Sequence, residues 1–95
     1  MNVYLVEAYA SRTSGSEVEA AAERASAAAA GLSDAGAAVR HRGSIFLPDD
    51  EISFHLFEAA ASRSVAEVAR RAGIDFQRIL PVELVGRVVD AEPPR

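Results

Sequence analysis

The chain of 95 residues contains no cysteine, which excludes disulfides, thiolate metal sites and cysteine nucleophiles. It also contains no lysine, and its ten basic residues are arginines that form no basic run. Together with a net charge of -4, this argues against nucleic acid or an anionic membrane as a partner. No apolar stretch approaches the roughly 20 residues of a membrane span. A signal peptide has a basic region before its apolar residues, and the first apolar residues here are not preceded by one. The cytoplasm is therefore the expected location.

Several catalytic signatures are missing as well. The sequence has no phosphate-binding glycine loop, no dinucleotide fingerprint and no histidine–glutamate cluster at zinc spacing. Ser44 and Ser53 are expected near His55 in a hairpin, but nothing supplies an oxyanion site, which disfavours nucleophilic catalysis. A binding protein is favoured over an enzyme, and the sequence alone names no reaction.

What the chain does contain is the composition of one globular domain, 49% hydrophobic and 25% charged. Its apolar patterns predict the order strand, helix, strand, strand, helix, strand. The first half is expected to contain a strand over 3–9 and a helix beginning with the capping pair Ser16 and Glu19. Two strands follow, over 38–47 and 51–59, around a turn at 48–50. The rest is expected to contain a helix that begins with the capping pair Ser64 and Glu67 and ends at Gly73, and an edge strand over 78–89 that contains Pro81. Residues 1–90 form the expected single domain, and residues 91–95 a frayed C-terminal tail.

This order predicts an α+β, ferredoxin-like βαββαβ fold, in which a four-stranded antiparallel sheet carries both helices on one face. The first helix has an apolar face made almost entirely of alanine, so it can lie close to the sheet. The other face of the sheet is left without a covering layer.

Side chains alternate across a strand, which separates a helix-side set from an open-side set. By apolarity, the helix side is expected to take Tyr4, Val6, Ala8, Val39, His41, Ile45, Leu47, Ile52, Phe54 and Leu56. The open side then carries Val3, Leu5, Tyr9, Phe46 and Phe57 around Glu7, Arg42 and His55. Because an apolar sheet face is rarely left in water, we expect a homodimer through this open face.

The candidate functional residues follow from this arrangement. His55 and Glu7, placed together in a partly dry interior, suit a metal ion or acid/base chemistry, or else form a buried hydrogen-bonded pair that fixes the dimer register. His41 is either an aromatic residue at the margin of the core or a metal ligand that needs a second donor. Arg42 is expected to pair with Glu7 or to hold an anionic ligand, with Phe57 and Tyr9 as apolar neighbours on the same face.

The sequence also resembles a known family. The segment VRHRGSIFLPDDEISFHLFEA and the helix end ARRAGIDFQRI are similar to a family of small bacterial ferredoxin-like proteins, long described as a domain of unknown function, with nickel-binding members. The motifs that carry the resemblance are Glu7 late in the first strand, Ser44-Ile45-Phe46 before an acidic turn, and Arg70-Arg71-Ala72-Gly73. The chain departs from the family pattern at Gly43, where some members have histidine, and at His41, where an aromatic residue is usual. The resemblance implies a homodimer and divalent metal binding, with Ni²⁺ as the first ion to try.

Two functions are therefore expected from the sequence. The first is a small cytoplasmic dimeric protein that binds nickel or another divalent transition metal through His55, Glu7 and His41. The alternative is a dimeric α+β barrel enzyme or small-ligand-binding protein that uses Glu7 and His55 as acid/base groups.

Overall fold

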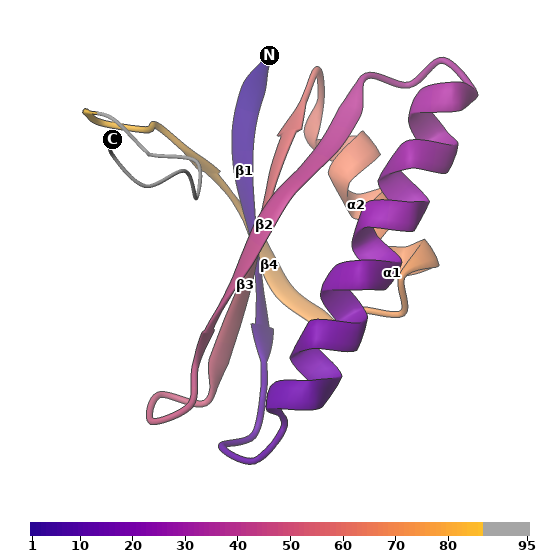
Figure 1. Ribbon diagram of the computed structural model, residues 1–95. Helices are drawn as coiled ribbons and strands as arrows, with labels where there is room; N and C mark the ends of the chain where they lie inside the picture. The colour runs from indigo at the N-terminus through magenta and orange to yellow at the C-terminus, as the bar shows by residue number, and fades with distance from the viewer. Residues whose placement is uncertain (87–95) are drawn as a thin grey trace, which may run out of the picture.

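A computed structural model describes residues 1–86 of the chain. The elements are β1 (Asn2–Tyr9), α1 (Gly15–Asp34), β2 (Val39–Leu47), β3 (Ile52–Ala59), α2 (Ser62–Arg71) and β4 (Phe76–Val82). The four strands form one sheet in the order β2-β3-β1-β4, and every neighbouring pair is antiparallel. Both helices lie against the same face of the sheet (Figure 1). The predicted ferredoxin-like α+β fold is confirmed.

Most element ends lie within one or two residues of the expected ones, and the differences that matter are at the helix starts and at the end of β4. The N-cap residues are Ser14 for α1 and Ala61 for α2, so the predicted capping residues Ser16 and Ser64 lie inside the helices. Strand β4 ends at Val82, well before the expected end at 89. The predicted tail, 91–95, and residues 87–90 of the expected strand lie outside the described residues. Within residues 1–86, no helix is long and apolar enough to cross a membrane.

The core lies between the sheet and the two helices. Helix α1 packs chiefly over β2, while α2 packs over β1, β3 and β4. The alanine face of α1 buries Ala25 and Ala29, and α2 adds Val65 and Val68. Small side chains on α1 allow the helix to approach the sheet closely, so the larger core groups come from the strands and from α2.

Strand β3 faces the opposite way from the prediction. Its helix-side set is Ser53, His55, Phe57 and Ala59, all buried, and the expected core set of Ile52, Phe54 and Leu56 lies on the open face. The pairing with β1 sets this orientation, because His55 lies opposite the buried Val6. The more apolar side of β3 is therefore turned away from the helices.

Strand β2 changes sides at a bulge. Its pairing with β3 shifts between His41 and Gly43, where two residues of β2 oppose the single residue Leu56. Gly43 has a φ of 153°, a backbone angle that residues with a Cβ rarely adopt. Before the bulge, Val39 and His41 face the helices as predicted; beyond it the prediction is wrong, because Ser44 and Phe46 face α1 and Ile45 is 54% exposed.

The open face of the sheet carries a broad set of apolar side chains. Two ion pairs interrupt it, one between Glu7 and Arg78 and one between Arg42 and Glu58. Strand β4 lies at the sheet edge, as expected from Pro81, and its pairing with β1 shifts between Glu7 and Ala8. The alternation of the paired strands places on this face Val3, Leu5, Ile45, Leu47, Ile52, Phe54, Leu56, Leu80 and Val82.

Candidate functional site

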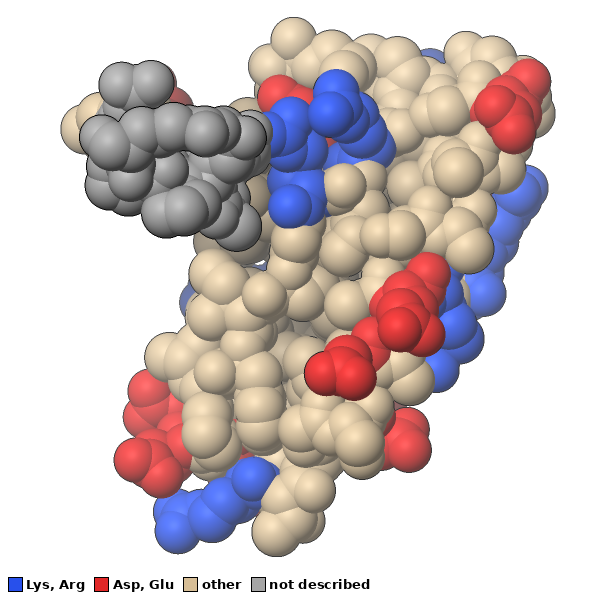
Figure 2. Space-filling model, viewed as in Figure 1, with Lys and Arg blue, Asp and Glu red and all other residues tan. Residues whose placement is uncertain are grey.

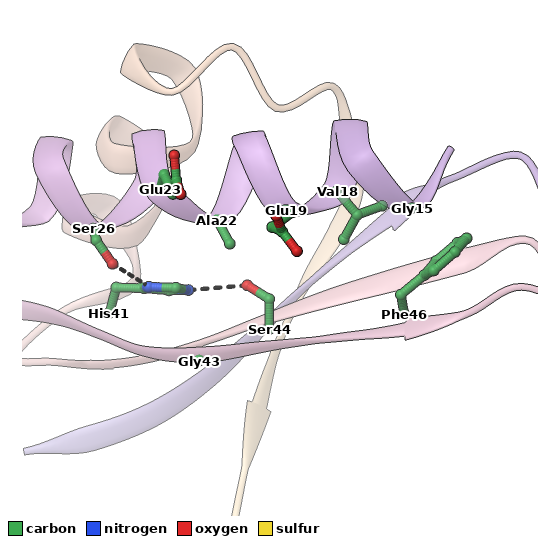
Figure 3. A pocket seen from close by; sticks show the side chains of 10 residues that line it. All are labelled: Gly15, Val18, Glu19, Ala22, Glu23, Ser26, His41, Gly43, Ser44 and Phe46. Atoms are coloured by element: carbon green, nitrogen blue, oxygen red, sulfur yellow. Dashed lines mark hydrogen bonds between the residues drawn. The ribbon is translucent and has the colours of Figure 1, made fainter. Parts of the chain in front are cut away.

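A cleft of about 560 Å³ lies between α1 and the bulged part of β2. Figure 3 shows the helix above the strand, with His41, Ser44 and Phe46 rising from β2 toward α1. The helix contributes a polar end at Ser26 and an apolar wall at Val18. The full lining is Gly15, Val18, Glu19, Ala22, Glu23, Ser26, His41, Gly43, Ser44 and Phe46.

A continuous chain of hydrogen bonds runs from the cleft into the core. The hydroxyl of Ser26 is 2.7 Å from His41 Nδ1, and His41 Nε2 is 3.0 Å from Ser44 Oγ (Figure 3). Ser44 Oγ is in turn 2.6 Å from Nδ1 of His55. The bulge makes this possible, because it brings both His41 and Ser44 to the helix side although they are three positions apart. The four groups connect α1, β2 and β3.

Burial keeps the imidazoles of His41 and His55, the two rings in this row of hydrogen bonds, neutral near pH 7. Desolvation lowers the pKa of His55 to about 4, and the nearby His41 contributes further. Desolvation also lowers the pKa of His41, partly offset by a hydrogen bond with the backbone of Gly43. The His41 ring has two aromatic neighbours, with centroid distances of 5.1 Å to Phe57 and 6.3 Å to His55. The site therefore offers uncharged nitrogen atoms, which can bind a metal or exchange a proton.

The hydrogen-bonded chain has two consistent arrangements of its protons. In one, Ser26 donates to His41 Nδ1, His41 Nε2–H donates to Ser44, and Ser44 donates to His55 Nδ1. In the other, every bond is reversed, and His55 Nδ1–H donates first. Conversion between the two requires Ser26 to take up a proton from the cleft and His55 to release its Nε2 proton, after which both rings are again neutral. The geometry therefore permits proton relay as well as ligand binding.

A second, smaller cavity of about 250 Å³ borders the other end of the chain. His55 and Ser53 line it from β3, and Glu17 and Arg24 line it from α1. Arg24 donates from Nε to the carbonyl of Ala72 at 2.7 Å, which ties α1 to the end of α2. His55 thus lies between two cavities, connected to the first through Ser44 and lining the second.

Glu7 does not take part in this site. It lies opposite Phe54 in the β1–β3 pairing and faces the open side, whereas His55 faces the helices. Its carboxylate accepts a hydrogen bond from Arg78 Nε at 2.6 Å. The predicted pairing of Glu7 with His55 is wrong, because the sidedness of β3 was reversed in the prediction.

The three expected ligand-binding residues are not brought together. Phe57 is completely buried in the core beneath the helices, so it cannot belong to the open face. Arg42 lies on the open side and pairs with Glu58 at 3.0 Å, in place of the expected Glu7. Tyr9 is 63% exposed at the end of β1, with its hydroxyl near Glu51.

Sequence reasoning missed the cleft and one of the four groups in the hydrogen-bonded chain, Ser26, which stands in a run of alanines. Ser44 was expected near His55, as found, but on the other face of β2. Gly43 was the available signal, since a glycine inside a strand often marks a bulge. Among residues 1–86, no group of three or more histidine, aspartate or glutamate side chains is arranged to hold a metal ion.

Comparison with known proteins supports the fold and leaves the function open. No family model matches the chain, and no curated protein matches it in sequence. One solved structure that matches is the crystal structure of SCO4226 from Streptomyces coelicolor A3(2), with a TM-score of 0.69 and 16% sequence identity. The match covers 88% of this chain and 99% of that chain. At this identity, the similarity shows the fold alone.

Proposed function

We propose that this protein is a cytoplasmic homodimer that binds a divalent transition metal, with nickel as the first ion to test, through His41 and His55. The observation that carries the proposal is that imidazole nitrogen atoms from two neighbouring strands converge on one hydroxyl. His41 Nε2 and His55 Nδ1 lie 3.0 and 2.6 Å from Ser44 Oγ. The resemblance of the sequence to a family with nickel-binding members supports the choice of ion.

The chemistry of these donors fits a nitrogen-preferring metal. Imidazole suits Ni²⁺, Cu²⁺ and Zn²⁺, and it must be unprotonated to bind. The lowered pKa values of both histidines meet this condition at neutral pH. An ion held by both nitrogens takes the place of the hydrogen bonds to Ser44, so this hydroxyl competes with the metal. Glu7 is excluded as a ligand of this ion, because it lies on the other face of the sheet.

The dimer part of the proposal rests on the open face of the sheet. Strand β3 turns Ile52, Phe54 and Leu56 away from the helices and places Ser53 and Ala59 beneath them. Such a distribution favours a second apolar layer over the open face, and a second copy of the same face is the simplest partner.

Titration calorimetry of the metal-stripped protein with Ni²⁺ tests the site. The variants His41→Phe and His55→Gln each remove one nitrogen ligand, and each should weaken Ni²⁺ binding at least about tenfold, which corresponds to about 1.4 kcal/mol. Ser44→Ala removes the competing hydroxyl and should leave binding unchanged or tighter. Glu7→Gln is the matched control and should bind like the original protein. Unchanged affinity in both histidine variants would refute the site.

Sedimentation velocity tests the dimer independently of the metal. The original protein should sediment with the mass of two chains. Leu5→Glu places a charge in the middle of the open face and should give single chains, whereas Ala27→Glu, at an exposed position of α1, should leave the dimer intact. A single-chain mass for the original protein at high micromolar concentration would rule out this interface.

A further inference from the structure

The cleft between α1 and β2 contains two carboxylates that the metal proposal does not use. Glu19 and Glu23 are both exposed, and neither makes an ion pair or hydrogen bond within residues 1–86. In contrast, Glu7, Glu58 and Glu67 are all paired with arginines. Figure 3 shows Glu19 and Glu23 on successive turns of α1, with Glu19 directed toward β2 and Glu23 at the level of the helix.

The charge of the cleft is uniformly negative. Its lining includes the carboxylates of Glu19 and Glu23 but no arginine. Figure 2 shows acidic side chains gathered over α1 on this face of the molecule. Like charges four residues apart on a helix repel each other. A positive group between the two carboxylates would remove this repulsion, whereas an anionic ligand would be repelled.

The remaining walls of the cleft divide into an apolar part and a polar end. Val18, Ala22 and Phe46 supply the apolar part, and Ser26 with His41 supplies hydrogen-bonding groups at one end. A volume of about 560 Å³ falls within the range of small-molecule sites, which combine apolar walls with a few polar groups. Apolar walls are unsuited to a bare Ca²⁺ or Mg²⁺ ion, which requires six or more oxygen ligands.

We propose that the cleft is a binding site for a small organic cation, namely a protonated amine with an apolar body. The ammonium group lies between Glu19 and Glu23, and the apolar body packs against Val18, Ala22 and Phe46. A hydroxyl or carbonyl group at the far end of the ligand reaches the Ser26–His41 pair. This site needs no metal, so it goes beyond the proposed function and does not depend on it.

A matched pair of probes tests the proposal in the metal-free full-length protein at pH 7. Tyramine carries the ammonium group, an aromatic body and a hydroxyl, and 4-hydroxyphenylacetate has the same body with a carboxylate in place of the amine. In ¹H–¹⁵N NMR titrations, tyramine should shift the resonances of residues 15–26 and 41–46 in a saturable way. 4-Hydroxyphenylacetate should cause no saturable shift in these segments.

Variants connect the binding to the two carboxylates. The double variant Glu19→Gln with Glu23→Gln should weaken tyramine binding at least tenfold, and both positions are exposed, so the fold should be retained. Glu17→Gln is the matched control, because Glu17 lies on the same helix but lines the second cavity. Equal binding of the two probes, an unchanged affinity in the double variant, or no saturable shift with tyramine at millimolar concentration would each overturn the proposal. Failure of nickel binding would leave it intact.

Discussion

Acidification of the metal-free protein should reduce its stability through His55. This side chain is only 1% exposed, and its pKa falls from 6.5 to about 4 on folding. In the unfolded chain the imidazole takes up a proton below about pH 6.5, so the unfolded state binds protons more strongly than the folded state. The contribution of His55 to stability is therefore complete above this pH and is lost as the pH falls toward 4.

The size of the loss follows from the two pKa values. His55 alone should lower the free energy of unfolding by roughly 1 kcal/mol at pH 5.5 and by roughly 2–3 kcal/mol at pH 4.5. His41, whose pKa is also lowered, acts in the same direction. Three other charged residues, Glu17, Arg24 and Asp75, border the second cavity beside His55. The part of the stability loss that comes from His55 is therefore measured by comparison with a variant that lacks this histidine.

Urea unfolding followed by circular dichroism at pH 7.5, 5.5 and 4.5 measures this loss. The His55→Gln variant cannot titrate at this position, so the original protein should lose roughly 2–3 kcal/mol more than the variant between pH 7.5 and 4.5. An NMR titration of the His55 ring should give a midpoint near 4. Equal pH slopes in the two proteins, or a midpoint near 6.5, would refute the reasoning.

Three substitutions test other parts of the structure by urea unfolding at pH 7.5. Ser44→Ala leaves the ring nitrogens of two histidines without their partner and should destabilise the protein by about 1–3 kcal/mol; a loss below about 0.5 kcal/mol would contradict the hydrogen-bonded chain. Gly43→Ala should cost about 1–3 kcal/mol because of its φ of 153°, whereas Gly31→Ala, with open space around it in α1, should stabilise by about 0.5–1 kcal/mol. A stabilising Gly43→Ala would argue against the bulge. In single chains, as in the Leu5→Glu background, Glu7→Gln should change stability by less than about 1 kcal/mol, because the ion pair with Arg78 is then on an exposed face, and a larger change there would contradict this.

The sequence predicted the order of elements and the sheet, because these depend on local periodicity. The alternation in β1 correctly assigned Tyr4, Val6 and Ala8 to the core, since the opposite set contains a charged residue. Pro81 correctly indicated an edge strand, because proline has no backbone N–H to donate to a neighbouring strand. Apolarity failed in β3, where the more apolar set, including Phe54, faces away from the helices. Pairing with β1 sets this strand's orientation, and the sequence of β3 alone does not contain that information.

The candidate site was predicted only in part for the same reason. Both histidines were identified, since a polar aromatic residue among apolar neighbours attracts attention in any strand. Ser44 was expected near His55 but on the open side of the sheet, because it reaches the helix side only through the bulge. Ser26 has no local pattern of its own, and its role depends on how α1 lies over β2.

The bulge in β2 also ties the cleft to one extra residue in the strand. Removing one residue at Arg42–Gly43 would leave a single residue opposite Leu56, and His41 and Ser44, then two positions apart, would both still face the helices. Losing the bulge at unchanged length would instead carry Ser44 to the open face and turn Ile45 and Leu47 toward the cleft, with no sequence change at either histidine. In relatives of this chain, a one-residue gap at this point therefore keeps the hydrogen-bonded chain, whereas a strand of the same length without the bulge separates Ser44 from both histidines.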